Sequence, residues 1–277
     1  MKKVWFVTGA SKGLGLSLVK RLLKEGHRVA ATSRDVATLI KKVGPKAENF
    51  LPLSMDLSNE DNVAEAVSQT VGHLGTIDVL VNNAGFGQGG AVEEVSNDLA
   101  RKNFEVNVFG LLNVTRSVLP VMRKQKSGHI FNIASIGGFT GAFSGFGVYC
   151  GTKFAVAGIT EGLHADLTPL GIKVTLIYPG YFRTDFLASD SFSNPDRRIE
   201  DYQAAHQLLA KHESEIGGNQ PGDPEKAAEV FIKVASHSHA PLHLFLGSDS
   251  YEMAEHKIQL LKEELEQNKV HSYFTNF

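Results

Sequence analysis

Thr8-Gly9-Ala10-Ser11-Lys12-Gly13-Leu14-Gly15 is the stretch that decides the fold of this chain. It joins an apolar run over residues 4–8 to a helical pattern over residues 14–25. Glycine suits a junction where the chain turns tightly, where a helix packs on a strand and where backbone approaches a pyrophosphate. The N-terminus of the following helix offers free N–H groups to phosphate. The junction therefore predicts a dinucleotide site, with a plain glycine turn as the alternative for the motif taken alone.

Outward from this junction, short apolar runs alternate with helical patterns. The runs occupy residues 4–8, 28–32, 50–55, 77–82, 129–134, 173–178 and 242–246. They lack polar residues at alternate positions, as expected of strands buried on both faces. The alternation predicts a doubly wound α/β (Rossmann) fold, with a mostly parallel, seven-stranded sheet and helices on both faces.

Several residues predict where helices begin and end. Gly26 is expected to terminate the first helix in a left-handed conformation. Ser58 is expected to cap a helix over residues 59–74, and Asp223 followed by Pro224 marks another helix start.

Residues 1–277 are expected to form a single Rossmann-type domain. Residues 185–222 break the alternation, since they are polar and contain a helix-like piece near residues 200–215. Long segments of this kind are often lids or binding loops, so we expect a substrate lid here. Residues 248–277 are predicted to form a charged C-terminal helix and tail.

The composition excludes several classes of protein. Lys and Arg number 28 against 30 Asp and Glu, so a strongly basic nucleic-acid binder is excluded and a membrane-surface partner has no electrostatic basis. The apolar runs are too short for a membrane span, and no targeting signal is recognised, so a cytoplasmic location is expected. The single cysteine, Cys150, excludes an intrachain disulfide and a cysteine metal cluster, and is expected to be a packed thiol.

Glycine is the unusual component, with 27 residues where average usage would give about 19. Twelve of them fall in three loops that follow predicted strands. These are Gly9, Gly13 and Gly15, then Gly85, Gly87, Gly89 and Gly90, then Gly137, Gly138, Gly141, Gly145 and Gly147. Because ligands bind at the carboxyl ends of strands in an open parallel sheet, these loops predict the position of the ligand cleft.

Tyr149 and Lys153 lie four residues apart, so they share one face of a helix. A nearby fixed cation favours the phenolate form and lowers the pKa of a tyrosine toward neutral pH. Ser135 follows a predicted strand end, where its hydroxyl is placed to hydrogen-bond a carbonyl oxygen. Taken alone, however, the Tyr-x-x-x-Lys spacing is a weak signal, because many helices carry it by chance.

The motifs together resemble the short-chain dehydrogenase/reductase family. Thr8–Gly15, Asn82-Asn83-Ala84-Gly85, Asn107, Ser135, Tyr149/Lys153 and Pro179-Gly180 occur in the order and approximate spacing of that family. The resemblance covers roughly residues 2–247.

The resemblance implies a catalytic set. Tyr149 would be the proton donor for carbonyl reduction or the base for alcohol oxidation. Lys153 would lower its pKa and hold the nicotinamide ribose, and Ser135 would orient the carbonyl. Asn107 would hold a water that links Lys153 to solvent, with a plain helix-capping or backbone-bonding role as the alternative.

The resemblance also implies a cofactor-binding set. Its members are Gly9, Ser11, Lys12, Gly13, Leu14, Gly15, Ser33, Arg34, Asp56, Leu57, Asn83, Ala84, Gly85, Tyr149, Lys153, Pro179, Gly180 and Thr184. Within this set, Asp56 resembles the family's aspartate that contacts adenine. The alternative is that Asp56 only stabilises a turn. Thr184 matches a contact to the carboxamide, and Asn82 with Gly85 would shape the adenosine side.

The end of the second strand predicts which dinucleotide binds. By family alignment Ser33 stands where NAD enzymes carry an acidic residue, and Arg34 follows it with a planar fork suited to a 2′-phosphate. Lys12 is expected to reach the same phosphate. Asp35 is an acidic residue that could serve NAD(H) instead, but we interpret it as the N-cap of a helix over residues 36–43. We therefore expect NADP(H), with NAD(H) as the alternative.

Aromatic residues gather near the predicted catalytic set. They are Phe139, Phe143, Phe146, Tyr181, Phe182, Phe186 and Phe192. They predict a hydrophobic pocket for a bulky or aryl ketone, with ordinary packing as the alternative. No metal is expected. His237 and His239 lie in a polar linker, and the Glu161-x-x-His164 motif occurs once, whereas a di-iron site needs it on two helices. The resemblance implies a homodimer or homotetramer built on the helices over residues 97–126 and 149–168.

The sequence thus predicts an NADPH-dependent enzyme that transfers hydride to a ketone or aldehyde, with Tyr149 as general acid. Two alternatives stay open at this point. One is a hydroxysteroid-type alcohol dehydrogenase acting oxidatively. The other is a non-catalytic NADP(H)-sensing regulator, which would have no need of an intact catalytic set.

Overall fold

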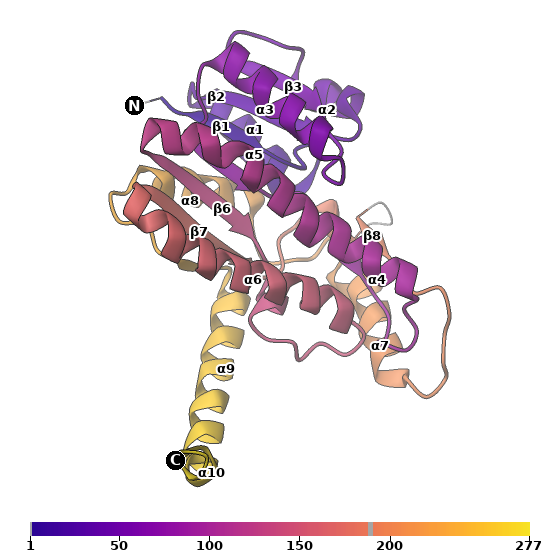
Figure 1. Cartoon of the computed structure of the whole chain (residues 1–277). Coiled ribbons are helices and arrows are strands. Elements are labelled where there is room, and N and C mark those ends of the chain that lie inside the picture. Colours follow the sequence, from indigo (N-terminus) through magenta and orange to yellow (C-terminus); the bar gives the residue numbers. More distant parts are fainter. Residues whose placement is uncertain (1, 188–190) are drawn as a thin grey trace.

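The computed structural model describes residues 2–187 and 191–277, and its centre is a parallel β-sheet (Figure 1). The strands of this sheet are β1 (Val4–Val7), β2 (Arg28–Ser33), β3 (Phe50–Ser54), β4 (Val79–Asn82), β6 (Gly128–Ile133), β7 (Ile172–Pro179) and β9 (His243–Leu246). In the described part of the chain these seven strands pair in the order β3-β2-β1-β4-β6-β7-β9, and every pair is parallel. The predicted doubly wound α/β fold is confirmed.

Helices cover both faces of the sheet. They are α1 (Gly13–Lys24), α2 (Val36–Val43), α3 (Glu60–Leu74), α4 (Asn97–Phe104), α5 (Gly110–Gln125), α6 (Gly147–Leu167), α7 (Gln203–Lys211), α8 (Pro224–Ser236), α9 (Ser248–Gln267) and α10 (Lys269–Phe274). One core layer joins α1, α2 and α8 to the sheet, and the opposite layer joins α3 and α5. Helix α6 packs on β7 through a third cluster.

Strand β1 shows how the sequence serves both layers. Trp5 and Val7 point into the layer under α1 and α8, and Val4 and Phe6 point into the layer under α3 and α5. All four are at most 3% exposed. Because successive side chains of a strand face opposite sides, a strand buried on both faces needs an unbroken apolar run.

The helix ends test four of the capping predictions. Gly26 has φ of 76°, in the left-handed region expected of a terminator. The Asp35 carboxylate accepts from the Thr38 N–H at 3.1 Å and caps α2, and Asp223 caps α8 with Pro224 in its first turn. The Ser58 prediction is wrong. Asn59 caps α3, because both the N–H and the hydroxyl of Ser58 donate to Asp56 instead.

The segment between β7 and α8 forms a lobe of its own beside α4, which the orange part of Figure 1 shows. It contains a two-residue strand β8 (Phe192–Ser193), which pairs in parallel with β5 (Gly87–Gln88), and the helix α7. The predicted helix over 200–215 is α7 followed by a π-helical turn over His212–Ile216. Residues 188–190 of the predicted lid lie outside the described residues.

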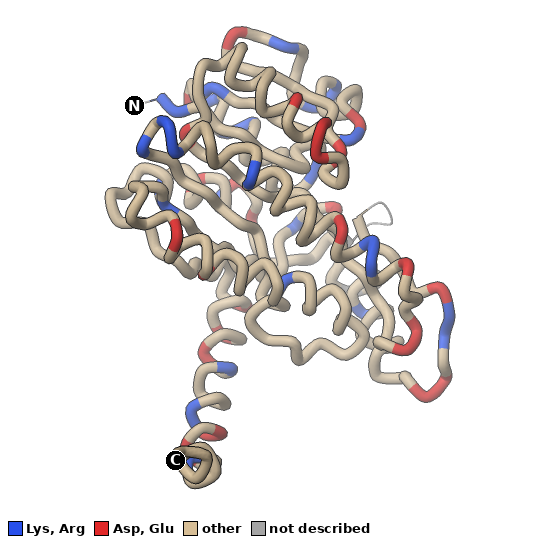
Figure 2. The backbone as a smooth tube through the Cα atoms, in the orientation of Figure 1, with Lys and Arg blue, Asp and Glu red and all other residues tan. Residues whose placement is uncertain are grey.

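Helix α9 leaves the body of the molecule as an arm, and α10 turns at its end (Figure 1). Only its first turns pack on the body, where Ser250 and Ala254 are buried. Figure 2 shows charges of both signs spread along the arm and over the body. Within residues 2–187 and 191–277, no helix has both the length and the apolar character to cross a membrane.

Candidate active site

A cavity lies at the carboxyl ends of β1, β4, β6 and β7, where the loops that follow these strands meet. Predicted site residues in its wall are Gly9, Lys12, Gly13, Leu14, Asn83, Ala84, Gly85, Ser135, Tyr149, Lys153, Pro179, Gly180 and Thr184. The structure therefore gathers most of the predicted set into one cavity.

The loop after β1 is tied closely to the loop after β4. The Thr8 hydroxyl accepts from the backbone N–H groups of Asn83 and Ala84, both at 3.0 Å. The Asn83 amide donates to the carbonyls of Thr8 and Gly9. A side chain at Gly9 would come within 2.7 Å of the Ala84 backbone, and Gly9 also has φ of 65°. Glycine at this position thus lets the two loops touch.

Helix α1 begins at this contact. Among the described residues, no side chain caps it through a hydrogen bond. Its first N–H groups and the positive end of its dipole lie beside cavity residues Lys12, Gly13 and Leu14. Such an end suits an anionic group.

Ser135 and Tyr149 come together on the other side of the cavity. Ser135 ends the extended stretch after β6, and its hydroxyl accepts from the Gly137 N–H at 3.1 Å. Tyr149 lies in the first turn of α6 and hydrogen-bonds with the Ser135 hydroxyl. Burial raises the pKa of Tyr149 above its ordinary value, and the bond with Ser135 only partly opposes that rise. The phenol is accordingly protonated at neutral pH.

Lys153 lies one turn further along α6 and is 5% exposed. Its Nζ donates to the Ile133 carbonyl at 2.9 Å and lies 5.8 Å from the centroid of the Tyr149 ring. Burial lowers the pKa of Lys153 to about 8, because the charged form loses its water. The ammonium is still protonated at pH 7.

Asn107 lies in a π-helical turn, Glu105–Phe109, between α4 and α5. Its Oδ1 accepts from the Phe86 N–H, and its Nδ2 donates to the Phe86 carbonyl and to the Thr152 hydroxyl. It also touches Gly85, where an added side chain would meet Asn107 at 2.9 Å and Lys153 at 3.6 Å. Asn107 thus makes the hydrogen bonds to backbone that were given as the alternative to its catalytic role. It also lies next to Lys153.

The remaining predicted cofactor residues lie outside the cavity wall. Ser11 and Gly15 belong to the α1 junction. The space that a side chain at Gly15 would need is taken by the Asn83 amide and the Gly9 carbonyl. Arg34 is exposed, and its charge helps to lower the pKa of Asp56, which Ser58 lowers most. Asp56 thus forms a turn with Ser58, which was given as the alternative to an adenine contact. Leu57 packs against Gly110.

The predicted aromatic pocket is found with one exception. Phe143, Phe146, Tyr181, Phe182, Phe186 and Phe192 line the cavity. Phe139 does not, because it packs edge-on against Tyr178 and Phe245 in the core beneath α6. Residues of the segment after β7 supply four of these six rings.

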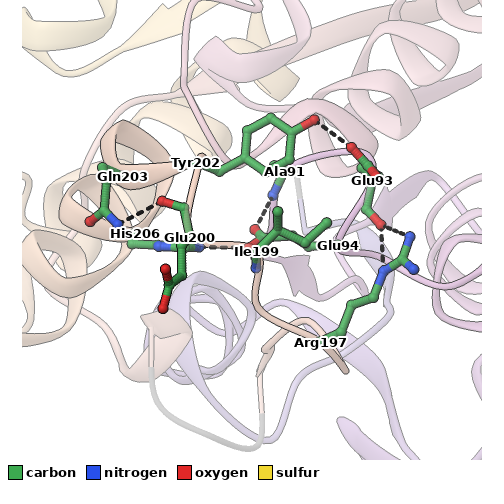
Figure 3. A network of polar contacts seen from close by, with 9 residues as sticks. All are labelled: Ala91, Glu93, Glu94, Arg197, Ile199, Glu200, Tyr202, Gln203 and His206. Carbon is green, nitrogen blue, oxygen red and sulfur yellow. Dashed lines mark hydrogen bonds and ion pairs between the residues drawn. The ribbon is translucent and has the colours of Figure 1, made fainter.

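Glu94 ties the lobe to the body, as Figure 3 shows. Its carboxylate is fully buried and accepts from the N–H groups of Ala91 and Ile199, at 2.9 and 2.8 Å. It also meets Nε2 of the buried His206 of α7 at 2.6 Å. These donors outweigh burial and hold the pKa of Glu94 below its usual value.

Sequence reasoning missed several residues near the site, among them three with polar side chains. His212 and Gln220 line the cavity, and Lys42 donates from α2 to the Ser11 carbonyl at 3.0 Å. All three come from helices or loops whose sequence has no motif, and only the fold brings them to the site. Within the described residues, no group of three or more His, Cys, Asp or Glu side chains is arranged to hold a metal ion.

The comparison with known families settles the class of protein. A family model described as "short chain dehydrogenase" matches residues 3–194, and the chain belongs to this family of oxidoreductases. The chain is 37% identical to Oxidoreductase BOA17 of Botryotinia fuckeliana over 92% of each chain. It is 35% identical to the 3-ketodihydrosphingosine reductase of Bacteroides thetaiotaomicron over 88% of each.

Solved structures show the same fold. A short-chain dehydrogenase from Streptomyces avermitilis superposes with a TM-score of 0.90 at 33% identity, over the whole of both chains. A 3-ketoacyl-(acyl-carrier-protein) reductase from Brucella melitensis, complexed with NADH, has a TM-score of 0.73 at 26% identity, over 88% of this chain and 96% of its own. ElxO with NADP bound has a TM-score of 0.73 at 25% identity, over 91% and 100%. Structures of this fold thus hold either dinucleotide.

Proposed function

We propose that this protein reduces a ketone or aldehyde with NADPH, with Tyr149 as the proton donor. The observation that carries the proposal is the meeting of Ser135, Tyr149 and Lys153 in the wall of the same cavity as the α1 junction. A cavity with an anion-binding helix end on one side and a phenol on the other fits a phosphate-bearing cofactor together with a carbonyl group.

The residues at the α1 end fit such a cofactor. Backbone N–H groups of α1 are available to phosphate, and glycines at positions 9 and 85 keep the wall close to the backbone. Lys153 would hold the ribose next to Tyr149. When bound, the nicotinamide ring supplies the hydride, as it does in dehydrogenases generally.

The raised pKa of Tyr149 fits the role of a proton donor. Because burial raises its pKa, the phenol holds its proton and is ready to give it to a carbonyl oxygen that gains charge. Ser135 keeps the phenol and that oxygen in line, and the Lys153 ammonium then stabilises the phenolate that is left. Oxidation would start from the phenolate, the form that burial disfavours.

Tyr149→Phe tests the proposal. General acid catalysis contributes typically 10²–10⁴-fold, so we expect kcat for ketone reduction to fall at least about 100-fold. NADPH binding, followed by fluorescence titration, is expected to persist. Tyr251→Phe removes a phenolic hydroxyl from an exposed site on α9 and serves as the matched control. An active Tyr149→Phe variant would refute the acid assignment, and tight NADPH binding without turnover of any ketone or aldehyde would favour the sensor.

The surroundings of Arg34 support NADP(H) as the cofactor. Asp35 is occupied as the cap of α2, Lys12 lines the cavity at the α1 junction, and Lys42 donates to the Ser11 carbonyl there. Arg34→Ala is expected to raise KM for NADPH about tenfold, since a charge-assisted bond contributes about 1.5–3 kcal/mol and this one is exposed. KM for NADH should change less than about twofold. Arg101→Ala, an exposed arginine of α4, is the control, and equal effects on both dinucleotides would contradict the phosphate assignment.

The substrate class follows from the cavity wall. Phe143, Phe146, Phe186 and Phe192 offer an apolar surface to a bulky or aryl carbonyl compound. The relative named 3-ketodihydrosphingosine reductase is named for a ketone substrate, which supports the same chemistry. A panel of aryl and alkyl ketones, followed by NADPH absorbance, identifies the preferred class.

The outer surface supports a homodimer or homotetramer. Phe109 at the start of α5 is 49% exposed and Phe154 of α6 is 45% exposed, on the helices that the resemblance implies as oligomer faces. Light scattering after size exclusion measures the mass, and a monomer would contradict this part of the proposal. A reducing compartment such as the cytoplasm suits the buried thiol of Cys150.

A further inference from the structure

Tyr181 and His212 form a polar pair inside an otherwise aromatic part of the cavity. The Tyr181 hydroxyl and Nε2 of His212 lie 2.8 Å apart, and both residues line the cavity. His212 is 5% exposed, and its ring packs at a tilt of 47° against Phe146 with a centroid distance of 4.7 Å. Phe146 in turn contacts Phe192 at 5.9 Å, so the pair is continuous with the apolar wall.

The direction of the hydrogen bond between the two side chains is fixed by a third group. Nδ1 of His212 lies 2.8 Å from the Leu208 carbonyl, which can only accept, so Nδ1 carries the ring proton. Burial lowers the pKa of His212, which keeps the ring neutral at pH 7 and leaves a lone pair on Nε2. Tyr181 must therefore donate to His212, and its oxygen keeps its lone pairs as free acceptors.

The pair is held in place from both sides. The Tyr181 N–H donates to Asp249 of α9 at 2.7 Å, and the Tyr181 carbonyl accepts from the Gly222 N–H at 2.9 Å. Burial raises the pKa of Tyr181 to about 12, so its hydroxyl is neutral. A fixed, neutral acceptor in apolar surroundings favours a neutral donor and disfavours a charged ligand.

We propose that Tyr181 and His212 form a subsite that accepts a hydrogen bond from a hydroxyl group of an otherwise apolar substrate, away from the carbonyl that is reduced. The substrate class is then a hydroxylated, mainly apolar ketone or aldehyde. This inference rests on the proposed function, because it assumes that the carbonyl compound occupies the cavity beside Tyr149.

The test uses three ketones that differ only at the far end of the ring. They are 4-(4-hydroxyphenyl)butan-2-one, its methyl ether and 4-phenylbutan-2-one, in which two methylene groups separate the ring from the carbonyl. Equilibrium binding to the NADPH-loaded protein gives one Kd for each. A net hydrogen bond of about 0.5–1.5 kcal/mol predicts that the wild type binds the hydroxy compound about 2- to 12-fold more tightly than the phenyl compound.

Three variants separate the subsite from general effects on the fold. Tyr181→Phe should bring the ratio of the two Kd values to about 1, whereas Tyr251→Phe should keep the wild-type ratio. His212→Phe keeps a ring against Phe146 but frees the Tyr181 hydroxyl to donate. The methyl ether should then gain at least about twofold relative to the phenyl compound.

The two proposals fail in different ways. Selective binding of the hydroxy compound without NADPH oxidation would overturn the proposed reduction and support the subsite. Turnover of the three ketones with equal Kd values would support the reduction and overturn the subsite. Equal affinity in the wild type, including no measurable binding of any of the three, or an unchanged ratio in Tyr181→Phe, overturns the inference.

Discussion

Replacing Glu94 by Gln is expected to open the lobe that holds α7 while leaving the central sheet intact. Glu94 is fully buried, and its two oxygens accept from Ala91, Ile199 and His206. Ile199 and His206 both belong to the lobe, whereas Ala91 belongs to the loop after β5 (Figure 3). This carboxylate is therefore a fully buried polar connection between the two, beside the more exposed contacts of Glu93 with Arg197 and Tyr202.

The size of the effect follows from counting these acceptors. Glutamine keeps one oxygen for Ile199 and His206 and turns an amide donor toward the Ala91 N–H. One bond is lost, a buried donor is left without a partner, and the remaining bonds lose their assistance by charge. Hydrogen bonds to charged groups contribute about 1.5–3 kcal/mol and an unsatisfied donor costs about 1–3, so we expect about 2–4 kcal/mol in total. The opening equilibrium of the lobe should rise roughly 30- to 900-fold.

Hydrogen exchange followed by mass spectrometry measures this opening peptide by peptide. Amides of residues 199–211 should exchange faster by that factor, and amides of β1 and β4 should not change. Glu93→Gln is the matched control, because Glu93 is the exposed neighbour that accepts from the Tyr202 hydroxyl. It should change the same peptides less than about threefold. Equal exchange in the two variants would refute the reasoning.

Two further outcomes follow from burial. Lys153→Met should raise the free energy of unfolding at pH 7 by up to about 3 kcal/mol, because it removes an ammonium whose pKa burial lowers from 10.5 to about 8. Between pH 8 and 10.5 the unfolded wild-type chain still holds this proton after the folded protein has lost it, so the wild type gains stability as the pH rises. The difference in free energy of unfolding between the variant and the wild type, measured in urea, should therefore fall below about 1 kcal/mol at pH 10. A difference that does not change with pH would contradict this account. Removal of residues 258–277, which are exposed, should leave the Tm within about 2 °C by calorimetry, and a larger drop would contradict the view that these residues stabilise nothing in the body.

The fold was predictable because the sheet is buried on both faces. A strand such as β1 then needs an unbroken apolar run, and its period differs plainly from that of the helices around it. The Asp35 cap was predictable for a similar reason, since an N-cap acts over three residues. Ser58 was assigned wrongly because Asp56, Ser58 and Asn59 all compete for the same turn, and their spacing alone does not decide which one caps α3.

Other parts of the site depend on contacts between distant segments. Strands β5 and β8 are two residues each and pair across more than 100 residues of chain, so neither has a readable pattern. Phe139 and Phe143 belong to the same glycine-rich loop, yet one faces the core and the other the cavity. His212 reaches the cavity because a π-helical turn follows α7, a local irregularity with no known sequence signal.

Glycines in and beside the cavity differ in what a substitution would meet, which is backbone at some positions and a replaceable side chain at others. A side chain at Gly9 would strike the Ala84 backbone, and one at Gly138 would strike the Lys153 carbonyl at 2.6 Å. At Gly87 and Gly89 it would meet the ring of Phe192, a side chain that a second substitution can shorten. Where glycine lies this close to backbone, a larger residue has no room, whereas beside the lobe the space can be changed by paired exchanges. On the proposed function, the substrate side of the cavity can then change while the dinucleotide side is kept.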